Sequence, residues 1–177
     1  MSDKAKKEFL SWVKTIVLAV IIALFVDYVV IVNATVPTGS MKNTIMEGDR
    51  VIALRFSYLF NDPQRGDVVI FEYPDAPEGE KILYVKRIIG LPGETVEVKD
   101  GGVYINGSDT PLEEDYIREE PIGEFGPYEV PEDSYFMMGD NRNDSQDSRY
   151  WVDKYVEKDE ILGKVVFKYY KKPGLIK

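Results

Sequence analysis

The hydrophobic pattern of the chain begins with a long apolar run near the N-terminus. Residues Thr15 to Val32 contain a single charged side chain, Asp27, and follow a basic segment with four lysines among residues 1–14. The run is close to the minimum of about 20 residues that a helix needs to cross a hydrocarbon core of about 30 Å. The pattern therefore predicts a transmembrane anchor over residues 15–33, with Asp27 near its outer end.

The lysines also predict the orientation of this anchor. Because basic residues accumulate on the cytoplasmic side of a span, residues 1–14 are expected in the cytoplasm and residues 34–177 outside. A cleavable signal peptide is the competing interpretation, since Val32-Asn33-Ala34 places small residues at a cleavage-like spacing. The apolar run exceeds the usual length of about 7–15 residues for such a peptide, so an anchor is favoured.

After the anchor, the pattern changes to short apolar runs separated by turn signals. Runs rich in Val, Ile, Tyr and Phe, without a long segment of helical period, predict an all-β domain. Asp100-Gly101 within residues 99–102 predicts a tight hairpin, because this pair supplies the positive φ that such turns need. Residues 106–133 are expected as a long loop or a small excursion from the β domain, and residues 139–150 are almost wholly polar. The predicted strands are Arg50–Tyr58, Asp67–Tyr73, Ile82–Ile89, Thr95–Val98, Val103–Ile105, Tyr135–Met138 and Ile161–Tyr170.

Two of these strands carry apolar side chains on both faces. The runs at residues 68–71 and 165–167 contain no polar residue. A strand of this kind either is covered on both sides by the protein itself or rests one face on a membrane or a partner. The interior of an ordinary β-sandwich is the simpler of the two interpretations.

Composition narrows the possible chemistry. The chain has 177 residues, which allows one domain of ordinary size and an appendage. It contains neither cysteine nor histidine, which excludes cysteine nucleophiles, Cys/His zinc sites and every catalytic set that uses histidine. The net charge of −9 is of the wrong sign for a protein that gains affinity by neutralising phosphates, so we expect no nucleic acid partner.

Ser40, just after the anchor, is a candidate nucleophile. It lies beside Gly39 in a loop, although Gly-Ser is also a common turn sequence. Without histidine, an activating base must be Lys, Asp, Glu or Tyr, and a lysine serves only when neutral, which burial promotes. Lys86, within an apolar strand, is the best candidate, and Lys164 is the next.

The polar stretch from residue 139 to residue 149 is dense in Asp, Asn, Arg and Ser. A loop held by its own ion pairs can support an active site from behind. A calcium loop is the alternative, but the spacing lacks the central Gly and terminal Glu of an EF-hand. We therefore expect no metal and no cofactor.

Four segments, considered together, resemble the sequence boxes of bacterial type I signal peptidases. They match in order and spacing, and the resemblance extends from the anchor to about Phe167. The single anchor and short C-terminus resemble the compact form common in Gram-positive bacteria. The four segments are Pro37–Met41, Gly66–Phe71, Tyr84–Glu94 and Met138–Trp151.

The resemblance implies a Ser-Lys dyad, with Ser40 as nucleophile and Lys86 as general base. It further implies an oxyanion hole formed by the Ser40 N–H and the Thr38 hydroxyl, and a hydrogen bond from Ser145 to the Lys86 amine. The residues implied as supports of the site are Asp147, Arg149, Asp140, Arg142 and Arg87.

Two positions depart from the family's usual pattern. Asn43 stands where the serine box usually has proline, and Asp27 stands where a basic residue is common. The first lies in a turn beyond the nucleophile and the second at the membrane end. Both departures therefore concern local geometry more than activity.

The function implied by the resemblance is removal of signal peptides from secreted preproteins, with cleavage after small residues at −3 and −1. The implied location is the bacterial plasma membrane, and the implied partners are signal peptides, the lipid bilayer and the secretion translocase. One alternative is a membrane-tethered β-domain that binds peptides without cleaving them. Another Ser-Lys protease, of the self-cleaving repressor type, would instead have a DNA-binding N-terminus.

Overall fold

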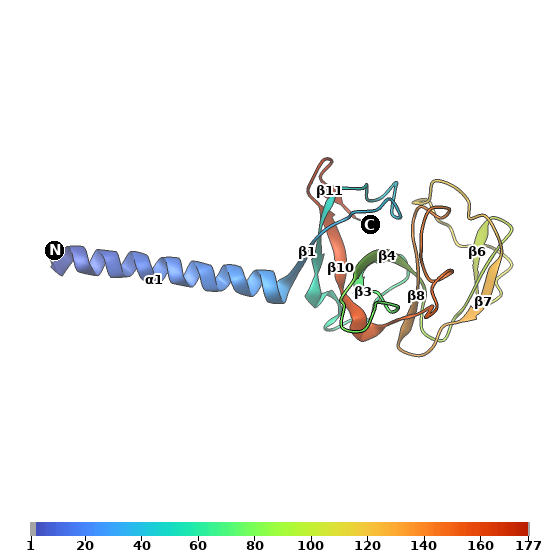
Figure 1. Ribbon diagram of the computed structural model, residues 1–177, viewed down its shortest axis with the longest axis horizontal. Coiled ribbons are helices and arrows are strands. Elements are labelled where there is room, and N and C mark those ends of the chain that lie inside the picture. The colour runs from blue at the N-terminus through green and yellow to red at the C-terminus, as the bar shows by residue number, and fades with distance from the viewer. Residues whose placement is uncertain (1–2, 177) are drawn as a thin grey trace.

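The computed structural model describes residues 3–176 and combines one long helix with a β-rich body. Helix α1, Asp3–Phe25, projects away from the strands, as Figure 1 shows. A π-helical turn, η1, Val26–Val30, joins it to the first strand. Residues 6–25 contain an 18-residue window with a mean hydropathy of 2.0 and are long and apolar enough to cross a membrane. The apolar helix expected near the N-terminus is confirmed, and residues 1–2 of the predicted tail lie outside the described part.

The β-rich body is built from two antiparallel sheets. The larger has the order β1-β2-β10-β3-β4-β8-β9, with β11 paired to β10, and the smaller has the order β6-β5-β7. The predicted hairpin at residues 99–102 joins β5 to β6. The strands are β1 Ile31–Thr35, β2 Arg50–Leu54, β3 Val68–Glu72, β4 Leu83–Gly90, β5 Thr95–Lys99, β6 Gly102–Ile105, β7 Phe125–Glu129, β8 Ser134–Met138, β9 Val156–Glu157, β10 Ile161–Lys168 and β11 Gly174–Leu175.

Three expectations about the elements need correction. Residues 31–33, expected at the end of the anchor, instead form the beginning of β1, which pairs with β2. Residues 55–58, expected to continue a strand, form a 3₁₀ helix, η2, Arg55–Tyr58. The stretch expected as a long loop contains β7, which pairs with β5.

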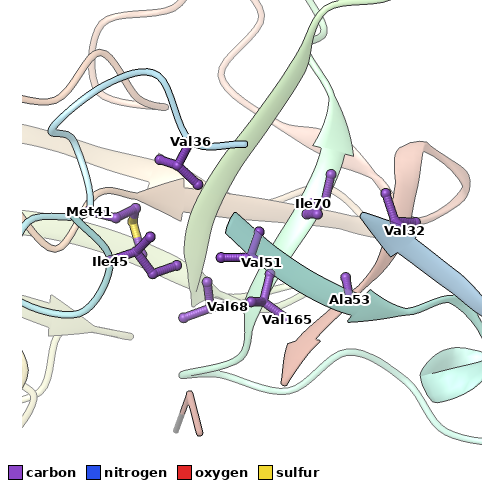
Figure 2. Packing of buried hydrophobic residues seen from close by; sticks show 9 residues of the cluster. All are labelled: Val32, Val36, Met41, Ile45, Val51, Ala53, Val68, Ile70 and Val165. Atoms are coloured by element: carbon purple, nitrogen blue, oxygen red, sulfur yellow. The ribbon is translucent and has the colours of Figure 1, made fainter. Parts of the chain in front are cut away.

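Three hydrophobic clusters fill the body, and β3 lies between two of them. Val68 and Ile70 belong to the cluster shown in Figure 2, together with Val32 of β1. Val69 and Phe71 point to the opposite face and pack in a second cluster. The apolar residues of β3 on both faces are therefore covered by the protein itself, which explains the unbroken apolar run.

Strand β4 is paired unequally along its two edges. On one edge it pairs with β3 over residues 83–87. On the other edge it pairs with β8 only from Arg87 onwards, through a register shift near Gly90. Within the described chain, residues 83–86 therefore have a sheet neighbour on one side only.

Candidate active site

A compact loop between β1 and β2, residues 36–49 and here called the serine loop, presents Ser40. Its turns are closed by hydrogen bonds from the Lys42 N–H to the Gly39 carbonyl at 3.0 Å and from the Ile45 N–H to the Met41 carbonyl at 2.8 Å. Met41 and Ile45 are fully buried in the same cluster as β1 and β2, and Figure 2 shows them side by side. Two apolar anchors thus fix the loop while Ser40 remains 8% exposed.

Lys86 lies on β4 and faces Ser40. Its Nζ donates a hydrogen bond to Ser40 Oγ at 2.7 Å, and the residue is 4% exposed. Burial disfavours the charged ammonium and lowers the pKa of Lys86 to about 8, with a smaller lowering from Arg149 that Asp147 and Asp140 oppose. The neutral amine is therefore far more abundant near neutral pH than at an ordinary lysine.

Lys164, the second candidate base, has a different environment. Its Nζ forms an ion pair with Asp67 at 2.5 Å, and its side chain is 40% exposed. Between the two candidates, only Lys86 combines burial with contact to Ser40.

Thr38 lies two residues before the candidate nucleophile. Its Oγ1 is 3.5 Å from Ser40 Oγ, at the outer limit of hydrogen bonding. Its hydroxyl is therefore close to the oxygen that would attack a carbonyl. This is the side of Ser40 on which the resemblance places the oxyanion donors.

The loop from Gly139 to Arg149, here called the acidic-basic loop, packs directly on the serine loop. The Asn141 N–H donates to the Ser40 carbonyl at 3.0 Å, and its side-chain amide donates to the Gly39 carbonyl at 3.0 Å. A Cβ on Gly139 would lie 2.5 Å from the Ser40 carbonyl oxygen and would also collide with Ser145. Only glycine permits this approach, so the spacing of the two loops depends on it.

Asp147 and Arg149 hold the acidic-basic loop from within. Arg149 donates to both oxygens of Asp147 at 2.8 Å, and both side chains are fully buried. Asp147 also accepts from the Gly139 N–H at 3.0 Å. A bidentate buried pair of this kind fixes orientation as well as charge.

Two further ion pairs surround this loop. Asp140 accepts two hydrogen bonds from Arg87, at 2.8 and 2.7 Å. It also accepts one from Thr44 of the serine loop at 2.5 Å. Arg142 is paired with Glu114, at 2.5 and 2.6 Å. The structure thus brings all the sequence-predicted supports close to the serine loop.

The expected hydrogen bond from Ser145 to Lys86 is not formed. Ser145 lines the same cavity as Lys86, but its buried Oγ has no hydrogen-bond partner among the described residues. Sequence reasoning also missed Glu114, Asn141 and Tyr116, which contact these loops. Asn141 lies inside a segment that was singled out for its polarity, whereas no local pattern marks Glu114 or Tyr116.

An open cavity of about 610 Å³ runs beside the serine and the lysine. It is lined by residues 34–40, by residues 82–86 of β4 and its approach, and by residues 143–146, with Ile70 and Tyr150. Its wall therefore includes the half-paired edge of β4. Across residues 3–176, no group of three Asp or Glu side chains is placed to hold a metal ion.

Comparison with known proteins decides the family. The family described as signal peptidase, peptidase S26, matches residues 9–170. The chain belongs to this family. Signal peptidase I of Leptolyngbya laminosa is 41% identical over 171 residues, which cover 94% of this chain and 82% of that relative. Signal peptidase I T of Bacillus subtilis is 37% identical over 177 residues, which cover 96% of this chain and 89% of that relative.

One solved structure is similar to part of this chain. The crystal structure of a signal peptidase I from Enterococcus faecalis V583 aligns with a TM-score of 0.49 and 36% identity, over 59% of this chain and 97% of that chain. The family resemblance stated from the sequence boxes is confirmed by the family match and the relatives. The chain is a serine peptidase of the signal peptidase type, with a mostly antiparallel β fold and an N-terminal apolar helix.

Proposed function

We propose that this protein removes signal peptides from preproteins through a dyad of Ser40 and Lys86. The observation that carries the proposal is the 2.7 Å contact between Ser40 Oγ and a buried amine. When neutral, Lys86 accepts the hydroxyl proton as the serine oxygen attacks the scissile carbonyl. The protonated amine then gives this proton to the departing amine of the mature protein. An acyl-enzyme remains, which water hydrolyses with Lys86 again acting as base.

In this proposal, the negative oxygen of the tetrahedral intermediate binds the Ser40 N–H and the Thr38 hydroxyl. The 3.5 Å separation of Thr38 Oγ1 from Ser40 Oγ supports the second donor. Each such donor contributes roughly 2.7–4 kcal/mol to transition-state stabilisation in a water-poor site. Asp147, Arg149, Asp140, Arg142 and Arg87 act as supports, since each lies in a buried ion pair around the two loops.

The proposed substrate binds as an extended strand along β4. Residues 83–86 lack a second sheet neighbour and line the cavity beside Ser40. Strand addition supplies main-chain hydrogen bonds, and alternate side chains of the peptide point into the cavity. Val36, Ile70 and Val85 line that cavity with apolar atoms, which suits cleavage after small residues at −3 and −1.

The proposed setting is a bacterial plasma membrane crossed once by α1, with the N-terminus in the cytoplasm. The lysine bias of residues 1–14 supports this orientation. The division into residues 1–14, 15–33 and 34–177 stays a prediction, apart from residues 31–33, which begin β1. A group of exposed apolar side chains, here called the η2 patch, supports contact of the body with lipid. It comprises Phe56, Leu59 and Phe60, and η2 contacts η1 at the end of the helix. Preproteins reach such a site through the secretion translocase.

Single substitutions of the two dyad residues test this function. Ser40→Ala and Lys86→Ala should each reduce cleavage of a preprotein in detergent or liposomes by at least about 1,000-fold, because nucleophile and base act as one unit. Lys164→Ala is the matched control and should keep its rate. Full activity of Lys86→Ala would refute the dyad, and binding without cleavage by the wild-type protein would indicate a peptide-binding domain instead.

A further inference from the structure

The segment between β6 and β7 carries two side chains that the dyad mechanism does not use. Glu114 has a side chain that is only 4% exposed, and Tyr116 is half-buried. Neither lies in a helix or strand. A carboxylate removed from water is costly unless it is paired and hydrogen-bonded, so the partners of Glu114 show what this segment holds.

Glu114 binds the acidic-basic loop through Arg142. The two guanidinium Nη atoms donate to the two carboxylate oxygens at 2.6 and 2.5 Å. The Arg142 Nε donates to the Gly139 carbonyl at 3.0 Å, and the Arg142 carbonyl accepts from Arg149 at 2.6 Å. Arg142 therefore joins the two ends of this loop, and Glu114 fixes its side chain in one orientation.

Tyr116 joins the same segment to the serine loop and to β4. Its carbonyl accepts a hydrogen bond from the Asn43 side-chain amide at 2.7 Å. Its ring covers the Arg87 guanidinium, with 3.8 Å between Cζ and the ring centroid. Its hydroxyl donates to Glu114 at 2.5 Å. Three parts of the candidate site thus meet on residues 114–116.

Asn43 has a backbone that suits this contact. Its φ of 92° lies in a region that Asn tolerates better than most residues and that proline cannot adopt. This is the position at which the serine box departs from the family's usual proline. The departure thus coincides with the contact between the serine loop and Tyr116.

We propose that residues 114–116 are a positioning clamp for the dyad, with Glu114 acting through Arg142 and Tyr116 acting through Asn43. Neither residue touches the reacting atoms. The clamp sets the distance between the serine loop and the acidic-basic loop, which meet where Gly139 packs on the Ser40 carbonyl. A misplacement of about 1 Å at such a contact can reduce a rate about 100-fold. The proposal rests on the Ser40–Lys86 function described above.

Glu114→Gln tests the first arm of the clamp, because it keeps the shape of the side chain and removes its charge. Well below the melting temperature, kcat should fall about tenfold or more, while KM changes less than about twofold. The midpoint of the dependence of kcat/KM on pH should also move. Asp147, Asp140 and Arg149 all shift the pKa of Lys86 and lie on the acidic-basic loop, so a displaced loop changes that pKa. The exposed neighbour Glu113→Gln is the matched control and should behave as wild type.

Asn43→Gly tests the second arm without straining the backbone, because glycine adopts a positive φ freely. It should lower kcat about threefold or more with an unchanged melting temperature. Unchanged kcat and pH midpoint in both variants, whatever their stability, would overturn the clamp. If the Glu114→Gln protein does not fold, the kcat of Asn43→Gly alone tests the clamp: an unchanged value would overturn it. Failure of the dyad itself is distinct, because cleavage would then survive Ser40→Ala.

Discussion

At the scale of single residues, the proposed chemistry depends on the Lys86 amine, whose pKa is shifted in both directions by its surroundings. Burial lowers the pKa of Lys86, whereas the carboxylates of Asp147 and Asp140 raise it. Each of these carboxylates is bound by an arginine, Arg149 and Arg87 respectively. Burial is the largest of these influences, and Arg149 adds a smaller lowering, so the pKa of Lys86 stays below its ordinary value. In the proposed dyad, the Asp147–Arg149 pair therefore affects the pKa of Lys86 as well as the geometry of the loop behind it.

The pH dependence of cleavage checks this balance. With a pKa of about 8 for Lys86, about one tenth of the amine is neutral at pH 7. We expect kcat/KM to rise about tenfold from pH 7 to a plateau above pH 9. Steady-state rates on a peptide substrate across this range measure the midpoint. A profile without a rise between pH 6 and 9, or a midpoint near 10.5, would contradict the assignment of Lys86 as base.

Stability provides a second measurement of the same pKa. Between pH 8 and 10.5 the unfolded chain binds a proton at Lys86 that the folded protein releases, so the free energy of unfolding should rise with pH across this window. The total rise is about 3 kcal/mol. Lys86→Met removes the titrating group and should remove this rise. Denaturant unfolding of both proteins at pH 8 and pH 10 makes the comparison.

At the scale of elements, the sequence predicts strands correctly where short apolar runs alternate with turn signals. The expected strand over residues 50–58 ends early, because the ladder partners of β2 in both β1 and β10 run out at Leu54. The sequence did not predict β1, because the apolar residues at the start of this strand continue the apolar run of the anchor without a break. The sequence did not predict β7 either, because this strand contains Pro127, and proline is unusual in a strand.

Only part of the candidate site could be predicted from the sequence, because some of its contacts join residues far apart in the chain. Without histidine or cysteine, few residue types remain that could act as a base. Among the lysines, Lys86 was predicted because it lies within an apolar strand. Glu114 and Tyr116 gave no such signal, because their partners are 28 and 73 residues away in sequence. Ser145 lines the same cavity as Lys86 without a hydrogen-bond partner among the described residues, and residue types do not encode the side-chain orientation that decides this.

Truncation tests where the β-rich body begins. A protein that starts at Ile31 keeps β1, its pairing with β2 and the buried Val32. A protein that starts at Val36 loses this edge strand and exposes part of the core, which should cost about 3 kcal/mol or more for the strand and its apolar contacts. Thermal unfolding of both truncated proteins measures the difference. Equal melting temperatures would show that β1 belongs with the anchor rather than with the body.

At the scale of the whole molecule, the chain places the proposed nucleophile, Ser40, close to the point where the helix ends. Ser40 lies ten residues after Val30, the last residue of η1, and ten extended residues reach at most about 35 Å. Half of that stretch is β1, which is fixed in the large sheet. A span formed by α1 thus holds the site near the bilayer surface, where the cleavage site of a membrane-bound preprotein would also lie.

The η2 patch should hold the body against that surface. Leu59 and Phe60 are 69% and 91% exposed, and each apolar side chain gains about 1.5–3 kcal/mol when fully buried. The double substitution Leu59→Ser and Phe60→Ser should therefore lower kcat/KM for a preprotein in liposomes about tenfold, because the body loses its preferred orientation. Cleavage of a short soluble peptide in detergent should be unchanged, since both side chains lie outside the cavity beside Ser40. Equal losses in the two assays would instead mean that the substitutions disturb the fold.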